Sequence, residues 1–209
     1  RYAGRFGAAR RSEWAKVQGR YSDLPFQEPA SQMMRMVGYA LQPEAGSGNE
    51  DERRHWAERM APLSEELGLR PADIGQSVWQ ERLAQAYPLH PQVLVVLPTL
   101  FRQLAQNERS LFAFLAGQEP WGLQETLRQR AAAGQEPIYR LPDLYRYVTG
   151  ALGASLLNQA RGRRWAELEE SLVRARDLAP IAQEALICIG TLNALGQEAA
   201  FRATPAHLA

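Results

Sequence analysis

Apolar residues recur at helical spacing along most of this chain, and that pattern limits the fold more than any other feature of the sequence. One example is a set four residues apart: Leu144, Val148, Leu152 and Leu156. A second helix, over 164–178, has these residues on one side: Trp165, Leu168, Leu172 and Ala175. The segment 181–195 is apolar nearly all round, so we expect it at the centre of a core. The pattern predicts a mainly α protein.

Glycine and proline predict where several helices end. Gly68 and Pro71 separate two short helices, over 64–67 and 71–87. Pro91 suits the first turn of a helix that continues to residue 105, and Pro98 within it predicts a kink or a restart.

Polar residues predict two helix starts. Asn107 is a good N-cap for a helix that ends near Gly117, and Asp143 is a good cap for the helix that carries Leu144 and Val148. No repeat at a fixed offset emerges, so a solenoid of tandem helical repeats is only a minor alternative.

The first fifty residues contain the one convincing strand. It is the segment DLPF, residues 23–26, and its proline confines it to a sheet edge or a strand end. A helix follows Pro29, with this expected apolar stripe: Met33, Met36, Val37, Ala40 and Leu41. Residues 42–54 combine Pro, Gly, Ser and charges with no large apolar residue, which predicts a flexible connector.

Composition places the chain among globular proteins. Its 209 residues, 45% of them hydrophobic, are enough for one or two cores, and a net charge of +1 gives no field that predicts nucleic acid or a membrane as partner. No apolar run is long enough to cross a bilayer. The single cysteine, Cys188, is expected as a buried apolar residue in a reducing, cytoplasmic environment.

Several kinds of chemistry lack the residues they require. The three histidines have no two-ligand helical spacing, and His90 is interpreted as a loop histidine, so no metal site is expected. A GxSxG nucleophile motif and a GxxxxGK[ST] phosphate loop are both missing. The arginines at 161, 163 and 164 are interpreted as part of a turn between two helices. The alternative is that they bind phosphate.

The segment AQNERSLFAFL places Asn107, Glu108 and Arg109 directly before an apolar run. An arginine at the start of a helix meets the partial positive charge of the helix amino end, so an anion should compensate it. Two interpretations follow. Arg109 pairs with Glu108 or a neighbouring helix, or it points outward to a phosphate.

Two tracts resemble AAA+ ATPases of the origin-recognition and clamp-loader type. NERSLFAFL resembles the sensor-2 helix of the small lid domain, and the resemblance implies that Arg109, with Asn107 in the same turn, binds the terminal phosphate of ATP. QGRYSDLPFQEPASQMMRMV resembles the stretch in which an arginine finger precedes a short strand and the first lid helix, and Arg20 stands at the finger position. The kinked helix over 87–104 lies between them, as the family order requires.

EWAKVQGRYSDLPF and LAQNERSLFAFL together look like large bacterial P-loop ATPases, some of them in phage-defence loci. The resemblance implies three parts. Residues 1–28 would end the ATPase core, 29–118 would form an enlarged helical lid with the connector 42–54, and 119–209 would form a helical extension toward a winged-helix module.

The resemblance also implies cofactors and partners. ATP and Mg²⁺ would bind the intact protein, held by an N-terminal P-loop core that this chain lacks. The partners would be that core and either further copies or defence-complex proteins, with nucleic acid left open and no membrane. Because the chain begins without methionine, we expect a piece of a longer polypeptide, without a complete active site of its own.

The alternative is a free-standing helical protein-interaction module without nucleotide chemistry. In that case Asn107 is an ordinary cap, and Arg109 and Arg20 are ordinary surface charges. An unrecognised small-molecule enzyme is a third, weaker alternative.

Overall fold

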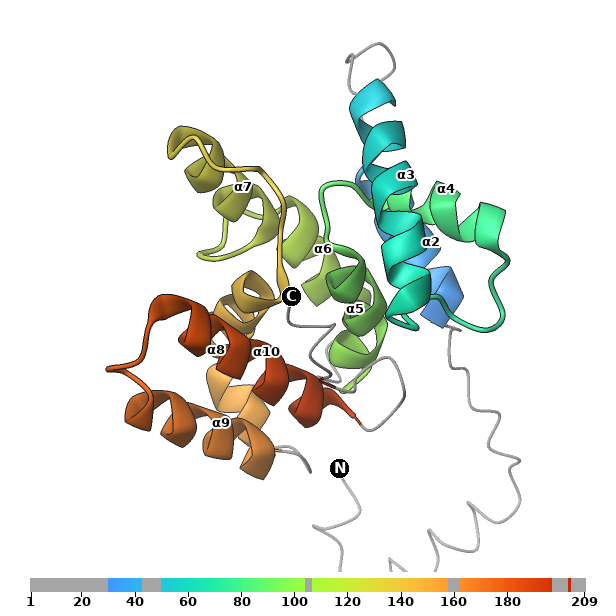
Figure 1. The fold of residues 1–209 in the computed structure, drawn as a ribbon. Coiled ribbons are helices and arrows are strands. Elements are labelled where there is room, and N and C mark those ends of the chain that lie inside the picture. Colours follow the sequence, from blue (N-terminus) through green and yellow to red (C-terminus); the bar gives the residue numbers. More distant parts are fainter. Residues whose placement is uncertain (1–29, 43–49, 104–106, 158–161, 197–202, 204–209) are drawn as a thin grey trace, which may run out of the picture.

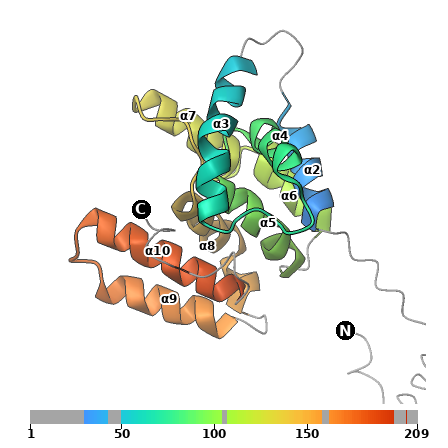
Figure 2. The same ribbon diagram turned by 45° about the vertical axis from the view of Figure 1, so that its right-hand side comes forward.

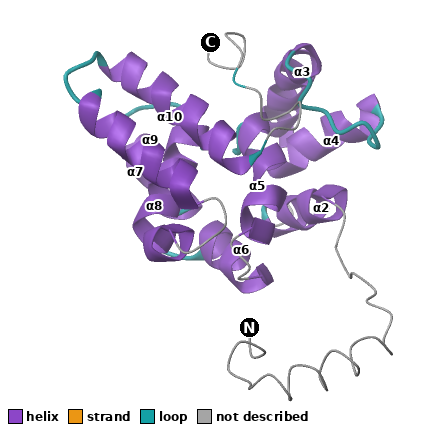
Figure 3. Cartoon of the chain, turned by 90° about the horizontal axis from the view of Figure 1, so that it is seen from below, coloured by secondary structure: helices purple, strands orange, loops and turns teal. Residues whose placement is uncertain are grey.

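The computed structural model describes residues 30–42, 50–103, 107–157, 162–196 and 203. Within helices, the side chains at 107–110, 152 and 154–157 are not described. The described part of the chain is helical, as predicted, and no strand lies within it (Figure 3). The predicted strand at 23–26 and the predicted core segment 1–28 lie outside the described residues.

The described helices are α2 (Ala30–Ala40), α3 (Glu50–Glu66), α4 (Gln76–Ala86), α5 (Pro91–Gln103), α6 (Asn107–Ala116), α7 (Leu123–Ala132), α8 (Leu141–Leu157), α9 (Gly162–Arg174) and α10 (Pro180–Leu195). In Figure 1, α2, α3 and α4 form one group, α8, α9 and α10 form another, and α5 and α6 lie between them.

Helix α5 is the centre of the fold. Nearly all of its residues are buried, and it contacts α2, α6, α8 and α10. Its central run VLVVLPTLF is almost wholly apolar, as a helix that contacts four others requires. Pro98 lies inside this helix, which continues through it, so the predicted restart does not occur.

Helices α3 and α4 pack together through a buried polar relay. The Trp79 indole N–H donates to Ser64 Oγ at 2.7 Å, and that hydroxyl donates to the Ala61 carbonyl at 2.8 Å. Gly68, at φ +63°, ends α3 as predicted, since a left-handed residue lets the chain reverse after a helix. Its backbone hydrogen bonds, and those of the next residue, form a Schellman motif.

A short parallel bridge sets the starts of α5 and α8 beside each other. The His90 amide donates to the Tyr139 carbonyl, and the Tyr139 amide donates to the Pro88 carbonyl, each at 2.9 Å. Each helix begins within two residues of this bridge. The bridge therefore fixes where the two helices enter the core.

Helices α9 and α10 form an antiparallel hairpin beside α8 (Figure 2). The two helices are in close contact at Gly190, where an added Cβ would lie 2.2 Å from a Leu168 methyl carbon. Arg164 donates to the Asn193 carbonyl at 2.8 Å across the same hairpin. Trp165 and Leu168 are buried and Leu172 is partly buried, which confirms the predicted face of α9, and Ala175 is buried just past the end of the helix.

One hydrophobic core extends from Met34 in α2 to Leu195 in α10. It crosses position 118 without a break, because residues of α5 and α6 and residues of α8 and α10 belong to the same cluster. The assignment of 29–118 to a lid and 119–209 to an extension stays a prediction.

Helix α2 buries much of the predicted stripe. Val37 is buried and Met33 and Leu41 pack against the main core, but Ala40 is exposed. The buried side also includes Met34 and Gly38. Gly38 faces α4, where its Cβ position would lie 3.0 Å from Gln85 Cβ.

Further boundaries and one burial differ from the prediction. Residues 64–66 belong to the longer helix α3, α4 begins at Gln76 rather than at 71, and α9 ends at Arg174 rather than at 178. Glu50–Glu66 is one helix, so the predicted connector 42–54 is helical from residue 50 onward, and residues 43–49 lie outside the described part. Helix α8 starts at Leu141, before its predicted cap. Ile181, at the start of α10, is 72% exposed, so only the second half of that helix is central to the core.

Candidate functional site

The predicted site residues are only partly described. Arg20 lies outside the described residues. Asn107 and Arg109 both belong to the first turn of α6, which begins at Asn107 and ends at Ala116, just before Gly117 as predicted. Their side chains are not described, so the roles assigned to them stay predictions.

Helix α6 continues directly into the segment 117–122, which we call the Trp121 loop. The Tyr139 hydroxyl donates to the Trp121 carbonyl at 2.8 Å, and the Tyr147 hydroxyl donates to Glu119 Oε2 at 2.8 Å. Both tyrosines are buried beside Phe114 of α6, with ring centroids 5.3 and 5.0 Å from it. The aromatic core therefore holds this loop in place.

Burial changes the acidity of these two hydroxyls. It raises the pKa of Tyr147, and the hydrogen bond and the charge of Glu119 raise it further. Burial also raises the pKa of Tyr139, with Asp143 as the next cause. Both phenols therefore stay protonated donors at neutral pH.

Trp121 has a strained backbone and an exposed ring. Its φ of +63° is an outlier for a bulky residue, yet its side chain is 42% exposed. Such strain costs on the order of 1–3 kcal/mol and persists where the surroundings enforce it, as they do at many binding sites. The Arg146 guanidinium lies over the indole, 5.6 Å from the ring centroid.

Two hollows meet at Trp121. The first, which we call the α7–α8 cleft, has a volume of about 610 Å³ and is lined by Trp121, Thr126, Arg130, Arg140, Asp143 and Arg146, among others. The second, which we call the α7 side cleft, has a volume of about 370 Å³ and is lined by Gln118, Pro120, Trp121, Glu125, Arg128 and Gln129. The indole and Gln129 border both.

Asp143 organises the arginines of the α7–α8 cleft. Its side chain is 3% exposed, and its two oxygens accept from Arg130 Nη2 at 2.8 Å and Arg146 Nη1 at 3.3 Å. Oδ2 also accepts from the Arg140 amide at 2.9 Å. Asp143 is therefore not the N-cap that the sequence predicted, but a first-turn carboxylate that accepts from the backbone amide preceding α8. It also holds two guanidinium groups at the cleft wall.

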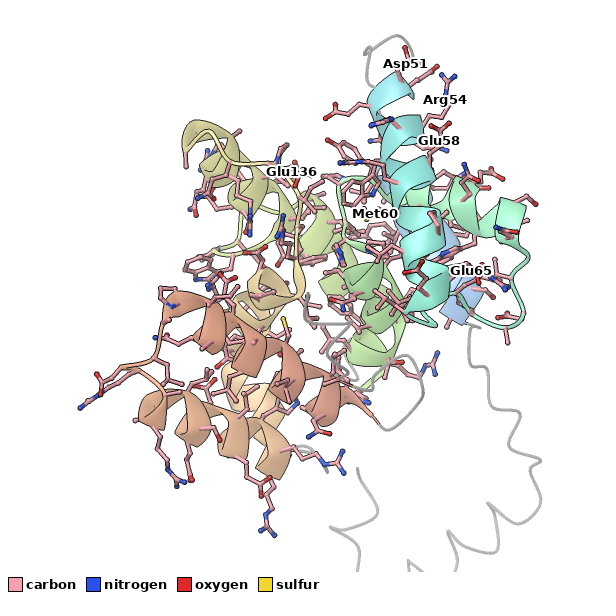
Figure 4. The ribbon with its side chains drawn as sticks, in the orientation of Figure 1. Asp51, Arg54, Glu58, Met60, Glu65 and Glu136 are labelled. Carbon is pink, nitrogen blue, oxygen red and sulfur yellow. The ribbon has the colours of Figure 1, made fainter. Side chains whose placement is uncertain are left out.

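Positive and negative charges are equal in number in the lining of this cleft. The guanidinium groups are those of Arg130, Arg140 and Arg146, and the carboxylates are those of Glu136, Asp143 and Glu184. Glu136, labelled in Figure 4, accepts from Arg140 Nη2 at 3.3 Å and lies 3.7 Å from Arg59 Nη2 of α3, outside the lining.

Thr126 has a buried hydroxyl at the wall of the cleft. The residue is 4% exposed, and its Oγ1 has no hydrogen-bond partner among the residues that the structure describes. An unpaired buried hydroxyl is costly, so each one in a folded protein calls for an explanation.

Other predicted features have structural roles. His90 Nδ1 accepts from the Gln92 amide at 3.3 Å at the start of α5, and burial, followed by the charge of Arg140, lowers its pKa to about 4. Arg163 pairs with Glu167 on the same helix at 2.9 Å. Cys188 is half-buried rather than buried, and burial raises the pKa of its thiol to about 11.

The described residues contain neither a group of metal ligands nor a helix that could span a membrane. No group of three His, Cys, Asp or Glu side chains there could hold a metal ion. No helix in the same part of the chain is long and apolar enough to cross a membrane.

The Trp121 site was not predicted from the sequence. The available signal was a tryptophan between Pro120 and Gly122, directly after a helix end. The arginines that join it come from two different helices, and only the fold brings them together.

Comparison with known proteins gives no relative. No protein-family model, no curated protein and no solved structure matches this chain.

Proposed function

We propose that this chain is the carboxyl-side helical part of an ATP-hydrolysing P-loop ATPase of the AAA+ type. The observation that carries the proposal is the position of Arg109 in the first turn of α6, which begins at Asn107. The resemblance of NERSLFAFL to a sensor-2 helix requires an arginine at the opening of a lid helix.

The chemistry of that position suits a nucleotide phosphate. A helix amino end carries unpaired N–H groups and partial positive charge, and both favour an anion. A guanidinium adds fixed charge and up to five donors for phosphate oxygens. In this proposal Arg109 senses the nucleotide, with Asn107 beside it, while Arg20 completes the site of a neighbouring subunit.

The packing of α6 provides a way to transmit nucleotide state. Leu111, Phe114 and Leu115 of α6 are buried in the main core, and the helix contacts α2, α5 and α7. Helix α5 in turn contacts α10. A shift of the first turn of α6 would therefore displace several helices at once, because a packed core moves as discrete pieces.

The test uses the longer polypeptide that this proposal requires. Its upstream sequence should contain GxxxxGK[ST] and a strand that ends in acidic residues, the parts that would hold ATP and Mg²⁺. Arg20→Ala should lower ATP turnover by roughly 10³- to 10⁵-fold if it acts as a finger in trans. Arg109→Ala should also lower turnover, with the helical circular dichroism of both variants unchanged.

A matched control is Arg102→Ala, since Arg102 is an exposed arginine in the last turn of α5. It should leave turnover unchanged. Unchanged turnover in both Arg20→Ala and Arg109→Ala, or an upstream sequence without a phosphate loop, would contradict the proposal.

Nucleic acid is a separate part of the proposal. If the ATPase acts on it through the arginines at 163 and 164, the double alanine variant should bind more weakly and show a smaller salt dependence. An unchanged salt dependence would exclude that surface.

A free-standing helical interaction module is the second candidate. The observation that favours it is Trp121, an exposed and strained aromatic residue between two clefts. For such a module, Asn107→Ala should cost about 1 kcal/mol of stability as a lost cap and should change no nucleotide-dependent property. A change in ATP turnover with unchanged stability would contradict it.

A further inference from the structure

We propose that the α7–α8 cleft binds an acidic peptide segment, with a peptide carboxylate between Arg130 and Arg146 and a neighbouring peptide side chain on the Trp121 ring. This inference rests on the second candidate function, the interaction module, and names its ligand class. It does not require nucleotide binding.

The guanidinium groups of the cleft have donors left for a ligand. Arg130, Arg140 and Arg146 each donate one side-chain hydrogen bond to a carboxylate, at 2.8, 3.3 and 3.3 Å. A guanidinium has five N–H donors in a planar fork that matches a carboxylate. Their side chains are 20%, 53% and 34% exposed, so solvent and ligands reach them.

Although the lining as a whole has equal numbers of arginines and carboxylates, Arg130 and Arg146 share one carboxylate, and that local pair favours an anion over a cation. Asp143 is paired with two arginines, and Glu136 accepts from Arg140 and lies near Arg59. A further carboxylate near Arg130 and Arg146 would therefore meet two guanidinium groups that share one buried counter-ion. Charge-assisted bonds of this kind are the stronger class of hydrogen bonds.

Thr126 Oγ1 is the second, independent observation. It lies at the same wall, buried and without a partner in the described part of the chain. Gln129 and Arg130 lie three and four positions further along α7, so they are its neighbours on the helix surface. When Gln129 and Arg130 rotate to contact a ligand, the Thr126 hydroxyl would become exposed to the cleft. It would then donate a hydrogen bond to a ligand oxygen.

The shape of the surface favours an extended segment over a free ion. The α7–α8 cleft alone has about 610 Å³, within the range of sites that enclose an organic ligand. Trp121 joins it to the α7 side cleft. A peptide that crosses the indole would occupy both, and aromatic residues and arginines are common anchors in such interfaces.

The experiment measures fluorescence anisotropy of two labelled peptides with the 209-residue chain. One peptide carries four consecutive glutamates between glycines, and the other carries four glutamines. We expect the glutamate peptide to bind at least roughly tenfold more tightly, because a charge-assisted hydrogen bond is worth about 1.4 kcal/mol or more.

Two pairs of variants locate the site. Thr126→Val should weaken binding of the glutamate peptide by roughly tenfold, because it removes a donor for the ligand without changing side-chain shape. Thr191→Val is the matched control, since Thr191 of α10 is equally buried and, among the described residues, equally unpaired, but lines neither cleft. Arg146→Gln should weaken binding, whereas Arg174→Gln, an exposed arginine of α9, should not.

Each contrary result overturns the inference. Equal binding of the two peptides would show that the cleft does not prefer acidic peptides. This conclusion would hold even if Trp121→Gly weakened the binding of both. Binding that Thr126→Val and Arg146→Gln leave unchanged places the peptide elsewhere. Binding of inorganic phosphate without binding of the glutamate peptide replaces the peptide with a small oxyanion. ATP turnover has no part in these readouts, so they are separate from the test of the ATPase.

Discussion

Three arginines of the described residues lie over aromatic rings, and two of them, Arg53 and Arg146, have opposite surroundings. Arg53 lies over Tyr87 at 5.7 Å from the ring centroid, and Arg146 lies over Trp121 at 5.6 Å. Arg53 donates only to backbone carbonyls, whereas Arg146 donates to a carboxylate beside an open cleft. The same pair of residue types therefore serves two different purposes.

Arg53 joins two helix ends. Its Nη2 donates to the Leu41 carbonyl at 2.7 Å, just past α2, and its Nη1 lies 3.3 and 3.2 Å from the carbonyls of Ala84 and Gln85 near the end of α4. Carbonyls at a helix carboxyl end have no intrahelical partner and carry partial negative charge. Arg53 is thus a structural residue, although its charge suggests a surface position.

Arg53 donates to backbone carbonyls at three positions, whereas Arg146 donates once, to Asp143, and has further N–H donors at the cleft. If Arg146 were removed, Asp143 would still accept hydrogen bonds from the Arg130 side chain and from the Arg140 amide. The comparison teaches that an arginine on an aromatic ring indicates a binding site only where its other donors face a cleft. We therefore expect loss of Arg53 to lower the stability of the fold and loss of Arg146 to weaken ligand binding.

The largest expected effect is the loss of Arg53. Arg53→Ala should lower the free energy of unfolding by about 3 kcal/mol, because several charge-assisted bonds are lost and three helix-end carbonyls lose their partner. Urea denaturation followed by circular dichroism measures it.

The neighbouring residue provides the control. Arg54 is 65% exposed and pairs only with Asp51, and both are labelled on the outer end of α3 in Figure 4. Arg54→Ala should change stability by less than about 0.5 kcal/mol. Equal effects of the two variants would mean that Arg53 does not join the helix ends.

The second expected effect is a loss of stability in acid, caused by His90, which lies beside the helix that carries Arg53. His90 lies beside Trp56 of α3, with ring centroids 6.5 Å apart, and burial lowers its pKa to about 4. The unfolded chain binds this proton near pH 6.5, so stability is lost as the pH falls from about 6.5 toward 4. Between pH 7 and pH 5 we expect a loss of about 2 kcal/mol from this group.

His90→Asn separates this titration from the others. Asparagine keeps an acceptor for the Gln92 amide at the start of α5 but does not titrate. The difference in unfolding free energy between pH 7 and pH 5 should shrink by about 2 kcal/mol in the variant. A pH dependence identical to that of the parent chain would mean that His90 has an ordinary pKa.

A smaller effect concerns the strain at Trp121. Trp121→Gly and Trp121→Ala both remove the indole, but only glycine adopts φ near +63° without cost. The glycine variant should be the more stable of the two by about 1 kcal/mol in thermal or urea unfolding. If the alanine variant were equally stable, the loop would not be strained. Both should lose binding of the glutamate peptide.

Much of the fold could be predicted from spacing alone. The buried face of α9 was correct because Trp165, Leu168 and Leu172 recur at helical spacing against polar neighbours. The ends at Gly68 and Gly117 were correct because glycine relieves the steric cost of leaving a helix.

Helices without an apolar stripe were missed. Helix α7 buries only Leu123 and Thr126, and the start of α3 is the charged run EDERR. That run was interpreted as a connector, but three acidic residues in a first turn also favour a helix start through the dipole. Charge was the informative signal there, and the periodicity gave none.

The site depended on contacts that the sequence does not contain. The positive φ of Trp121 is enforced by hydrogen bonds from Tyr139 and Tyr147, which come from segments 18 and more residues away. The sequence analysis did place Arg109 correctly near a helix start. It could not place the Arg146 side chain over an indole, since that requires the packing of α8 against the Trp121 loop.

The smallest expected effect is the loss of Arg146, and it completes the comparison with Arg53. Arg146→Ala removes a cation–π contact and one hydrogen bond at 3.3 Å to Asp143, but the aspartate keeps its shorter bonds at 2.8 and 2.9 Å. Partly exposed pairs of this kind contribute about 0–1 kcal/mol, so the variant should unfold within about 1 kcal/mol of the parent chain. A loss as large as that of Arg53→Ala would show that Arg146 is also a structural residue. Parent-like stability together with weakened peptide binding would assign Arg146 to recognition.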